Sequence, residues 1–321
     1  MRKALLAALV LLASAVPAFA APVRLPGDAD RLARASVDAM LSCEYLRATI
    51  LADSVVRLDA SHPAGWLLRA LAAFARYDDL TDPAEVAKAE SALGRADSLA
   101  EALGDEFWKG IAEYERGLLL AMRGQTMKGM LATRSGAVRL SRLKGNDDAS
   151  ALSAVYDYYL SEAISWLPFV ADERENAQAR LARGVDSTLY FGAVYREALV
   201  WIHWAKGEHD RGLALVDPVL EAHPANRVFR QIRGDLLRKA GRYDEAREAY
   251  SESLRQYREV SAEESVRGVC ALGNLALIEH FRNDFAARDA HLARFRELLP
   301  AVEPRMPKSL LDEMKREKLL R

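Results

Sequence analysis

The chain has 321 residues, of which 50% are hydrophobic and 28% are charged, and its formal net charge is −1. This balance argues against a nucleic-acid partner, because proteins that bind nucleic acids usually carry a basic patch or a high isoelectric point. No segment shows the alternating β-branched pattern of a half-buried strand, so we expect an all-α fold.

The first twenty residues have the pattern of a secretory signal peptide. Arg2 and Lys3 precede an apolar run over residues 4–16, and Ala18 and Ala20 are small residues where signal peptidase requires them. We expect cleavage after Ala20 and an exported protein, most simply periplasmic, with a net charge of −3 once both leader cations are removed. The alternative is an uncleaved anchor, although the run is shorter than the roughly 20 residues that span a bilayer. No later segment predicts stable membrane insertion, and no cysteine follows the cleavage site for lipid attachment.

The first half of the mature chain has the spacing of paired helices. Residues 51–58 lead to Pro63, which is expected to close one pair, and Asp82 with Pro83 opens a long amphipathic helix to about residue 103. Glycines at positions 117, 124, 129 and 136 mark a further pair. Residues 147–184 are the least regular part, with a helix that is expected to break near Pro168 and a second one that begins near Asp172.

In the second half of the chain a glycine recurs at an interval of 34 residues. Gly207 and Gly241 each stand between two helix-periodic runs. Within residues 227–260, Gly234 supplies a small residue in the first helix, and Ala246 and Tyr250 lie on one face of the second. These residues fit the helix-turn-helix skeleton of about 34 residues in the tetratricopeptide repeat. The segment resembles that family.

The resemblance implies an α-solenoid of helix-turn-helix pairs that forms a right-handed superhelix. The same frame fits residues 193–226 and 261–300, so the repeat domain is expected over residues 21–300. The last unit contains eight extra residues, and we expect them to lengthen its first helix at the start, where Ser261 and Glu264 have capping-box spacing. Residues 301–321 have amphipathic spacing, which predicts a helix that caps the last repeat.

The sequence predicts no cofactor, no metal centre and no enzymatic activity. Ser141 and Lys144 fit an S-x-x-K pattern, but the companion S-D-N and K-T-G motifs of serine-acylating enzymes are absent. The six histidines lack metal-ligand spacing, and no glycine-rich phosphate loop occurs. Cys43 and Cys270 fall in the first and last helical pairs. Because the ends of a solenoid are usually far apart, we expect no disulfide between them.

The resemblance also implies a concave surface lined by the first helix of each unit. The lining positions of the family select Val194, Glu197, Trp201, Trp204, Ala205, Val228, Gln231, Asp235, Arg238, Lys239, Cys270, Gly273, Leu277, His280 and Phe281, and in an earlier unit Ile111, Tyr114, Leu118, Ala121 and Met122. The peptide-binding groove that we predict from them consists of Trp201, Trp204, Gln231, Asp235, Arg238, Lys239 and His280.

Aromatic anchors and arginines carry much of the energy of protein interfaces, and we expect Arg238 and Lys239 to be exposed for that purpose. The alternative for Trp201 and Trp204 is that they pack against the irregular region around Trp166.

Two functions fit this sequence. The first is a scaffold that binds a protein or peptide segment, within an envelope assembly or secretion complex. The second is a small-molecule carrier, in which the superhelix closes around an aromatic-lined pocket and serves a transport system. An open groove would favour the first function and an enclosed apolar cavity the second.

Overall fold

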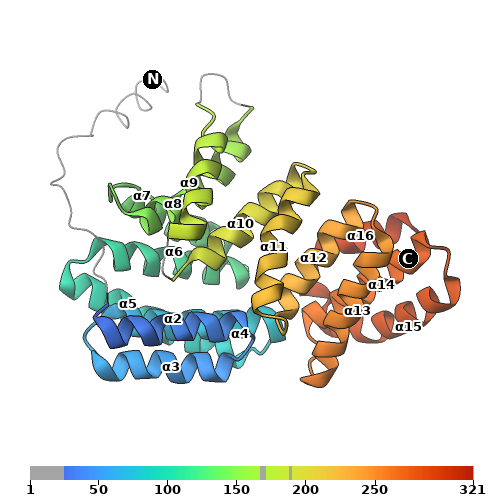
Figure 1. Cartoon of the computed structure of the whole chain (residues 1–321), viewed down its shortest axis with the longest axis horizontal. Coiled ribbons are helices and arrows are strands. Elements are labelled where there is room, and N and C mark those ends of the chain that lie inside the picture. The colour runs from blue at the N-terminus through green and yellow to red at the C-terminus, as the bar shows by residue number, and fades with distance from the viewer. Residues whose placement is uncertain (1–24, 167–170, 188–189, 321) are drawn as a thin grey trace.

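The computed structural model describes residues 25–166, 171–187 and 190–320, and this part of the chain forms a curved array of helices without strands (Figure 1). The helices are α2 Gly27–Leu41, α3 Tyr45–Leu58, α4 Pro63–Leu80, α5 Ala84–Leu103, α6 Glu106–Met122, α7 Thr126–Ser141, α8 Asp147–Ile164, α9 Arg174–Ser187, α10 Gly192–Ala205, α11 His209–Ala222, α12 Arg227–Lys239, α13 Tyr243–Glu259, α14 Val266–Phe281, α15 Phe285–Val302 and α16 Lys308–Arg316. Each helix packs mainly on its neighbours in sequence. The expected all-α solenoid is confirmed. The predicted leader and the helix break at Pro168 lie outside the described residues.

The turn glycines of the repeat pattern have a backbone conformation that favours glycine. Gly207 joins α10 to α11 with a φ of 73°, and Gly241 joins α12 to α13 with a φ of 75°. Side chains other than glycine rarely adopt this left-handed region. The 34-residue interval therefore marks the turn inside each helical pair.

The eight extra residues after Gly241 are shared among three places. Helix α13 has 17 residues against 14 in α11, α14 has 16 against 13 in α12, and the loop between α13 and α14 takes the rest. Helix α14 begins after Ser265, whose Oγ accepts a hydrogen bond from the Gly268 N–H at 3.1 Å. The predicted helix start at Ser261 was wrong, because Ser261 follows the end of α13 with a φ of 54°.

Helices α6 and α7 approach each other closely along a line of glycines. A Cβ on Gly117 would lie 2.5 Å from the Thr133 nitrogen and 2.7 Å from the Gly129 oxygen, and a Cβ on Gly136 would lie 2.5 Å from the Gly110 oxygen. Glycine inside a helix costs about 1 kcal/mol relative to alanine. The contact of one backbone with the other offsets that cost and holds α6 firmly in the array.

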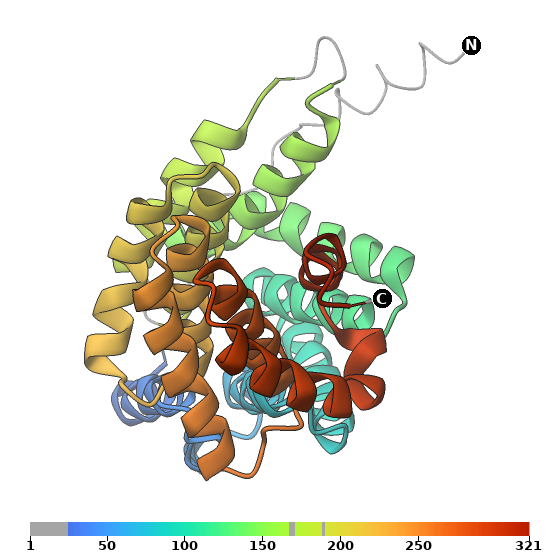
Figure 2. The same ribbon diagram turned by 90° about the vertical axis from the view of Figure 1, so that its right-hand side faces the viewer.

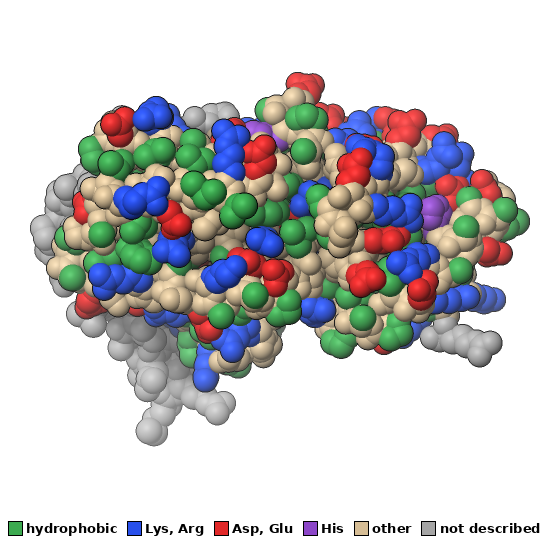
Figure 3. All heavy atoms as spheres, turned by 90° about the horizontal axis from the view of Figure 1, so that it is seen from below, with side chains coloured by type: hydrophobic (Ala, Val, Ile, Leu, Met, Phe, Trp, Pro, Cys, Tyr) green, Lys and Arg blue, Asp and Glu red, His purple; other side chains and the backbone are tan. Residues whose placement is uncertain are grey.

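Among the described helices, none combines the length and the apolarity needed to cross a bilayer. The face shown in Figure 3 mixes acidic and basic side chains, as the composition leads us to expect of a solvated helical array.

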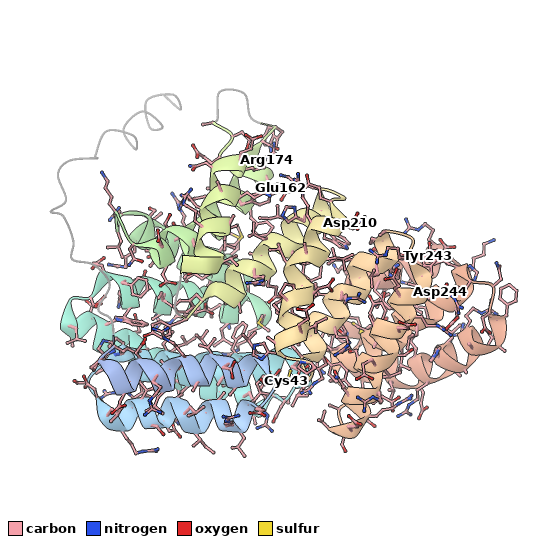
Figure 4. The ribbon with its side chains drawn as sticks, in the orientation of Figure 1. Cys43, Glu162, Arg174, Asp210, Tyr243 and Asp244 are labelled. Atoms are coloured by element: carbon pink, nitrogen blue, oxygen red, sulfur yellow. The ribbon has the colours of Figure 1, made fainter. Side chains whose placement is uncertain are left out.

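The array closes on itself, because the end of α4 and the end of α2 dock against α12 and α14. The Val266 N–H donates to Thr81 Oγ1 at 3.1 Å, and Asn226 Nδ2 donates to the Leu41 carbonyl at 2.7 Å. Each bond joins residues 185 positions apart. In Figure 2 the blue and orange helices accordingly lie side by side. The expectation that the first and last units lie far apart was wrong, and Cys43 lies at this junction (Figure 4).

A buried carboxylate, Asp79, holds the junction together. Its side chain is fully buried at the end of α4. Tyr257 Oη of α13 donates to Asp79 Oδ1 at 2.6 Å, while Tyr45 Oη at 2.8 Å and Arg227 Nη2 at 2.6 Å donate to Oδ2. Burial of a charge costs several kcal/mol unless hydrogen bonds and a counter-charge compensate it. The three donors, from three helices, supply that compensation.

Replacing Asp79 with alanine should lower the free energy of unfolding by about 3–5 kcal/mol, because it leaves the Arg227 guanidinium buried without its partner. Asp217→Ala is the matched control, since Asp217 pairs with Arg233 at 2.8 Å on the surface of the repeats, and exposed pairs contribute about 1 kcal/mol or less. Urea unfolding followed by circular dichroism measures both. Equal losses in the two variants would contradict the role given to Asp79.

Candidate functional site

The closure turns the concave surface into a cavity of about 370 Å³. Six helices line it, namely α2, α4, α6, α10, α12 and α14, with residues from the segment before α10 and from the start of α3. Apolar side chains of the wall include Val37, Met40, Leu71, Phe74, Leu118 and Val228. Most small-molecule sites are largely apolar cavities of roughly 300–1,000 Å³. The cavity has the size and lining of such a site.

The concave positions implied by the resemblance to the repeat family predicted part of this wall. Leu118, Val194, Glu197 and Val228, which the frame places on the concave surface, line the cavity. Tyr114, which the same frame selects, is buried in the core of the array instead. The cavity therefore takes some of the concave positions, among them those at the start of α10 and α12.

An unpaired acid, Glu115, lines the cavity from α6. It is 5% exposed, and within the described part of the chain it makes no hydrogen bond or ion pair. Burial raises the pKa of its carboxyl group to about 7. Sequence reasoning missed this residue. The available signal was its spacing, because Ile111, Glu115 and Leu119 form one buried stripe of α6.

A second group of charges lies on another part of the wall. Burial raises the pKa of Glu197, although the Arg267 guanidinium opposes that shift, and the Trp201 indole N–H lies 3.4 Å from Glu197 Oε1. Arg267 forms an ion pair with Asp78, and its Nε donates to the Asp78 carbonyl at 3.1 Å. The positive charge of Arg267 is thus already balanced within the wall.

The two predicted aromatic anchors lie in the repeats and pack mainly within them. Trp201 and Trp204 form a T-shaped pair with ring centroids 6.1 Å apart, and both pack, partly buried, against the core of the C-terminal repeats. Trp166, the expected packing partner, is 77% exposed. The Trp201 N–H contacts Glu197, which lines the cavity, while Trp201 itself does not line it.

Two further residues of the predicted groove make their contacts inside the repeats. Gln231 is buried, and its Nε2 donates to the Arg267 carbonyl at 2.7 Å. Asp235 accepts a hydrogen bond from the Tyr250 hydroxyl, and burial raises the pKa of its carboxyl group. These side chains tie α12 to α14 and α13.

The basic end of the predicted groove is occupied by the C-terminal helix. Arg238 Nη1 contacts Glu313 Oε1 of α16 at 2.7 Å, and Lys239 Nζ contacts Oε2 of the same carboxylate at 3.2 Å. His280 Nε2 lies 3.7 Å from Glu317 Oε2. The expectation that Arg238 is exposed was wrong, because only 8% of it is accessible beneath this contact.

The apolar side of α16 fills the rest of that surface. Met314 is fully buried, and its sulfur would lie 3.3 Å from a Cβ on Gly273 of α14. Leu310 is buried one turn earlier, and Cys270 Sγ lies 3.8 Å from Met306 Sδ. We call the surface of α12 and α14 beneath α16 the C-terminal groove.

The S-x-x-K serine takes part in local structure. Ser141 ends α7, is exposed, and donates from Oγ to the Val138 carbonyl of its own helix at 2.9 Å. Among the described residues, no cluster of three or more histidine, cysteine and carboxylate side chains is arranged to hold a metal ion.

Replacing Glu115 with glutamine should stabilise the protein at pH 8 and change little at pH 4. The folded-state pKa of about 7 lies above the ordinary value of 4.5, so the folded protein holds a proton that the unfolded chain releases between these values. The stability of the wild type therefore falls as the pH rises through that window. The shift corresponds to about 3 kcal/mol at pH 8.

Urea unfolding of both proteins at pH 4 and pH 8 measures this difference. Glu113→Gln is the control, because Glu113 lies two residues away and binds Arg139 and Ser135 outside the cavity. A wild type and a Glu115→Gln variant with the same pH dependence would show that Glu115 is not the buried acid described above.

Comparison with known proteins identifies the repeats. A family model for the tetratricopeptide repeat matches residues 225–287, which span α12, α13 and α14. No curated protein matches the chain. The crystal structure of the C-terminal part of a repeat-containing protein from Cytophaga hutchinsonii is 16% identical with a TM-score of 0.39, and the alignment covers 88% of this chain and 97% of that one. The crystal structure of yeast Tom70 is 13% identical with a TM-score of 0.34, over 86% of this chain and 70% of that one. The family model thus shows tetratricopeptide repeats within residues 225–287.

Proposed function

We propose that the protein is an interaction scaffold that binds, in the C-terminal groove, an amphipathic helix of a partner protein with an acidic residue next to a large apolar one. The observation that carries this proposal is the packing of α16 in the groove. Its Glu313 binds Arg238 and Lys239 together, while Met314 enters the hollow over Gly273. The chain's own helix thus displays the chemistry that the groove accepts.

Helix α16 is suited to exchange with an external helix. It has nine residues, and isolated helices shorter than about 12–15 residues are marginal in water. Its stability therefore comes from the groove, where burial of a leucine or methionine side chain contributes about 1.5–3 kcal/mol. A partner helix with the same pattern would gain the same contacts once α16 leaves, although the tether gives α16 an effective concentration near the millimolar range.

A fluorescent peptide of residues 306–321 tests the groove directly. In a chain with Glu313→Lys and Met314→Lys, α16 should leave its seat, and the free wild-type peptide should bind at least tenfold more tightly than it binds the unaltered chain. A peptide with the same two substitutions is the control and should not bind. Fluorescence anisotropy measures the affinities. Equally weak binding of the wild-type peptide to both chains would refute the proposal.

Reversing the charge of Arg238 and Lys239 to glutamate should abolish that peptide binding, because two carboxylates would then face Glu313. In the otherwise unaltered chain the same change should also lower the melting temperature, since Arg238 is buried against α16. Adding Glu313→Lys should restore part of the lost stability. Thermal unfolding of the three proteins measures the effect, and an unchanged melting temperature after charge reversal would mean that the ion pair does not hold α16.

The scaffold is proposed to act outside the cytoplasm, in the periplasm, within an envelope assembly or secretion complex. The support for export is the sequence of residues 1–20, with its basic start, apolar run and Ala18-Phe19-Ala20 cleavage pattern. Mass spectrometry of the protein from the periplasmic fraction should find Ala21 as its first residue. Recovery of the chain with Arg2 and Lys3 in place would show that the segment is retained.

A further inference from the structure

The central cavity contains a carboxyl group with which no described residue pairs. Glu115 is 95% buried and lines the cavity, and it has no hydrogen-bond or ion-pair partner among the described residues. A buried carboxylate without a partner costs free energy. Native proteins retain such groups chiefly where they serve a site, so the carboxyl of Glu115 calls for a ligand group that pairs with it.

The rest of the wall leaves the cavity acidic. Three carboxyl groups line it, those of Glu115, Glu197 and Asp78, against the single guanidinium of Arg267 within the described wall. Arg267 forms an ion pair with Asp78 and also acts on Glu197, so this one cation faces two carboxyl groups, and Glu115 has no counter-ion among the described residues. An anionic ligand would meet repulsion here, and a cationic one would be attracted.

The remaining surface of the cavity is apolar and reachable from solvent. Phe74, Leu71, Leu118 and Met40 contribute apolar wall. Val194 is 41% exposed, and the side chain of Asp78 is 42% exposed, so the cavity opens to water beside these residues. The volume of about 370 Å³ is too small for a partner helix, whose diameter with side chains is about 10–12 Å.

We propose that this cavity is a binding site for a small molecule with an apolar body and a protonated amine, which Glu115 pairs with and the apolar wall surrounds. The amine donates to the carboxylate of Glu115, and the body of the ligand displaces water from the wall formed by α2, α4, α6 and α12. This site is separate from the C-terminal groove, because Arg238, Lys239 and α16 do not line the cavity.

Three probes that share one aromatic body test the proposal by isothermal titration calorimetry at pH 8. They are 2-(1-naphthyl)ethylamine, 2-(1-naphthyl)ethanol and 1-naphthylacetate, which are cationic, neutral and anionic. The amine should bind at least tenfold more tightly than the alcohol, and the acetate most weakly. Equal affinities for the amine and the alcohol, or no binding of the amine, would overturn the proposal.

Two variants locate the binding. In Glu115→Gln the preference for the amine over the alcohol should disappear, whereas Glu113→Gln should keep it, because Glu113 lies on the same helix outside the cavity. Val194→Trp changes an exposed rim residue, so folding should be preserved, and the larger side chain should block all three probes. A preference that survives Glu115→Gln, or probe binding that survives Val194→Trp, would assign the binding to another surface and overturn the proposal.

Discussion

One buried carboxylate determines whether this helical array is open or closed. Repeats of paired helices can stack into an open superhelix whose first helices face a groove. Here Asp79, at the end of α4, accepts hydrogen bonds from α3, α12 and α13. A charge buried to this degree must keep its donors, so the early helices are held against the late repeats. The concave surface that would otherwise be an open groove becomes a cavity.

The closure divides the concave surface into two regions with different chemistry. The central region has an acidic and apolar wall with Glu115 at its surface, and its size suits a small molecule. The C-terminal groove has the basic pair Arg238 and Lys239, and it is filled by a helix that brings Glu313 to them. Different residues line the two regions.

Much of the fold could be predicted from the sequence, because repeats are specified locally. The turn at Gly241, the start of α13 at Tyr243 and the packing positions of Ala246 and Tyr250 all lie within one unit of about 34 residues. The amphipathic spacing after Pro307 likewise predicted a terminal helix. None of these features depends on residues that are distant in the chain.

The closure and the sites could not be predicted in the same way. Asp79 follows Asp78 at the end of a helix, where an acidic residue is normally solvated, and only contacts with Tyr257 and Arg227 reveal that it is buried. The seat of α16 depends on a contact between Arg238 and Glu313, 75 positions apart. An open groove would expose Arg238 and would give Glu115 no cavity to line, so the two positions depend on α16 and on the closure.

The most direct test of the closure is a distance measurement across the junction. Glu44 at the start of α3 and Glu221 at the end of α11 are both exposed, so spin labels can be attached there by cysteine substitution after Cys43 and Cys270 are replaced with alanine. Double electron–electron resonance should give one narrow distance distribution in this background, and a longer and broader one when Asp79→Ala is added. A broad distribution before that change, or an unaltered narrow one after it, would contradict the account.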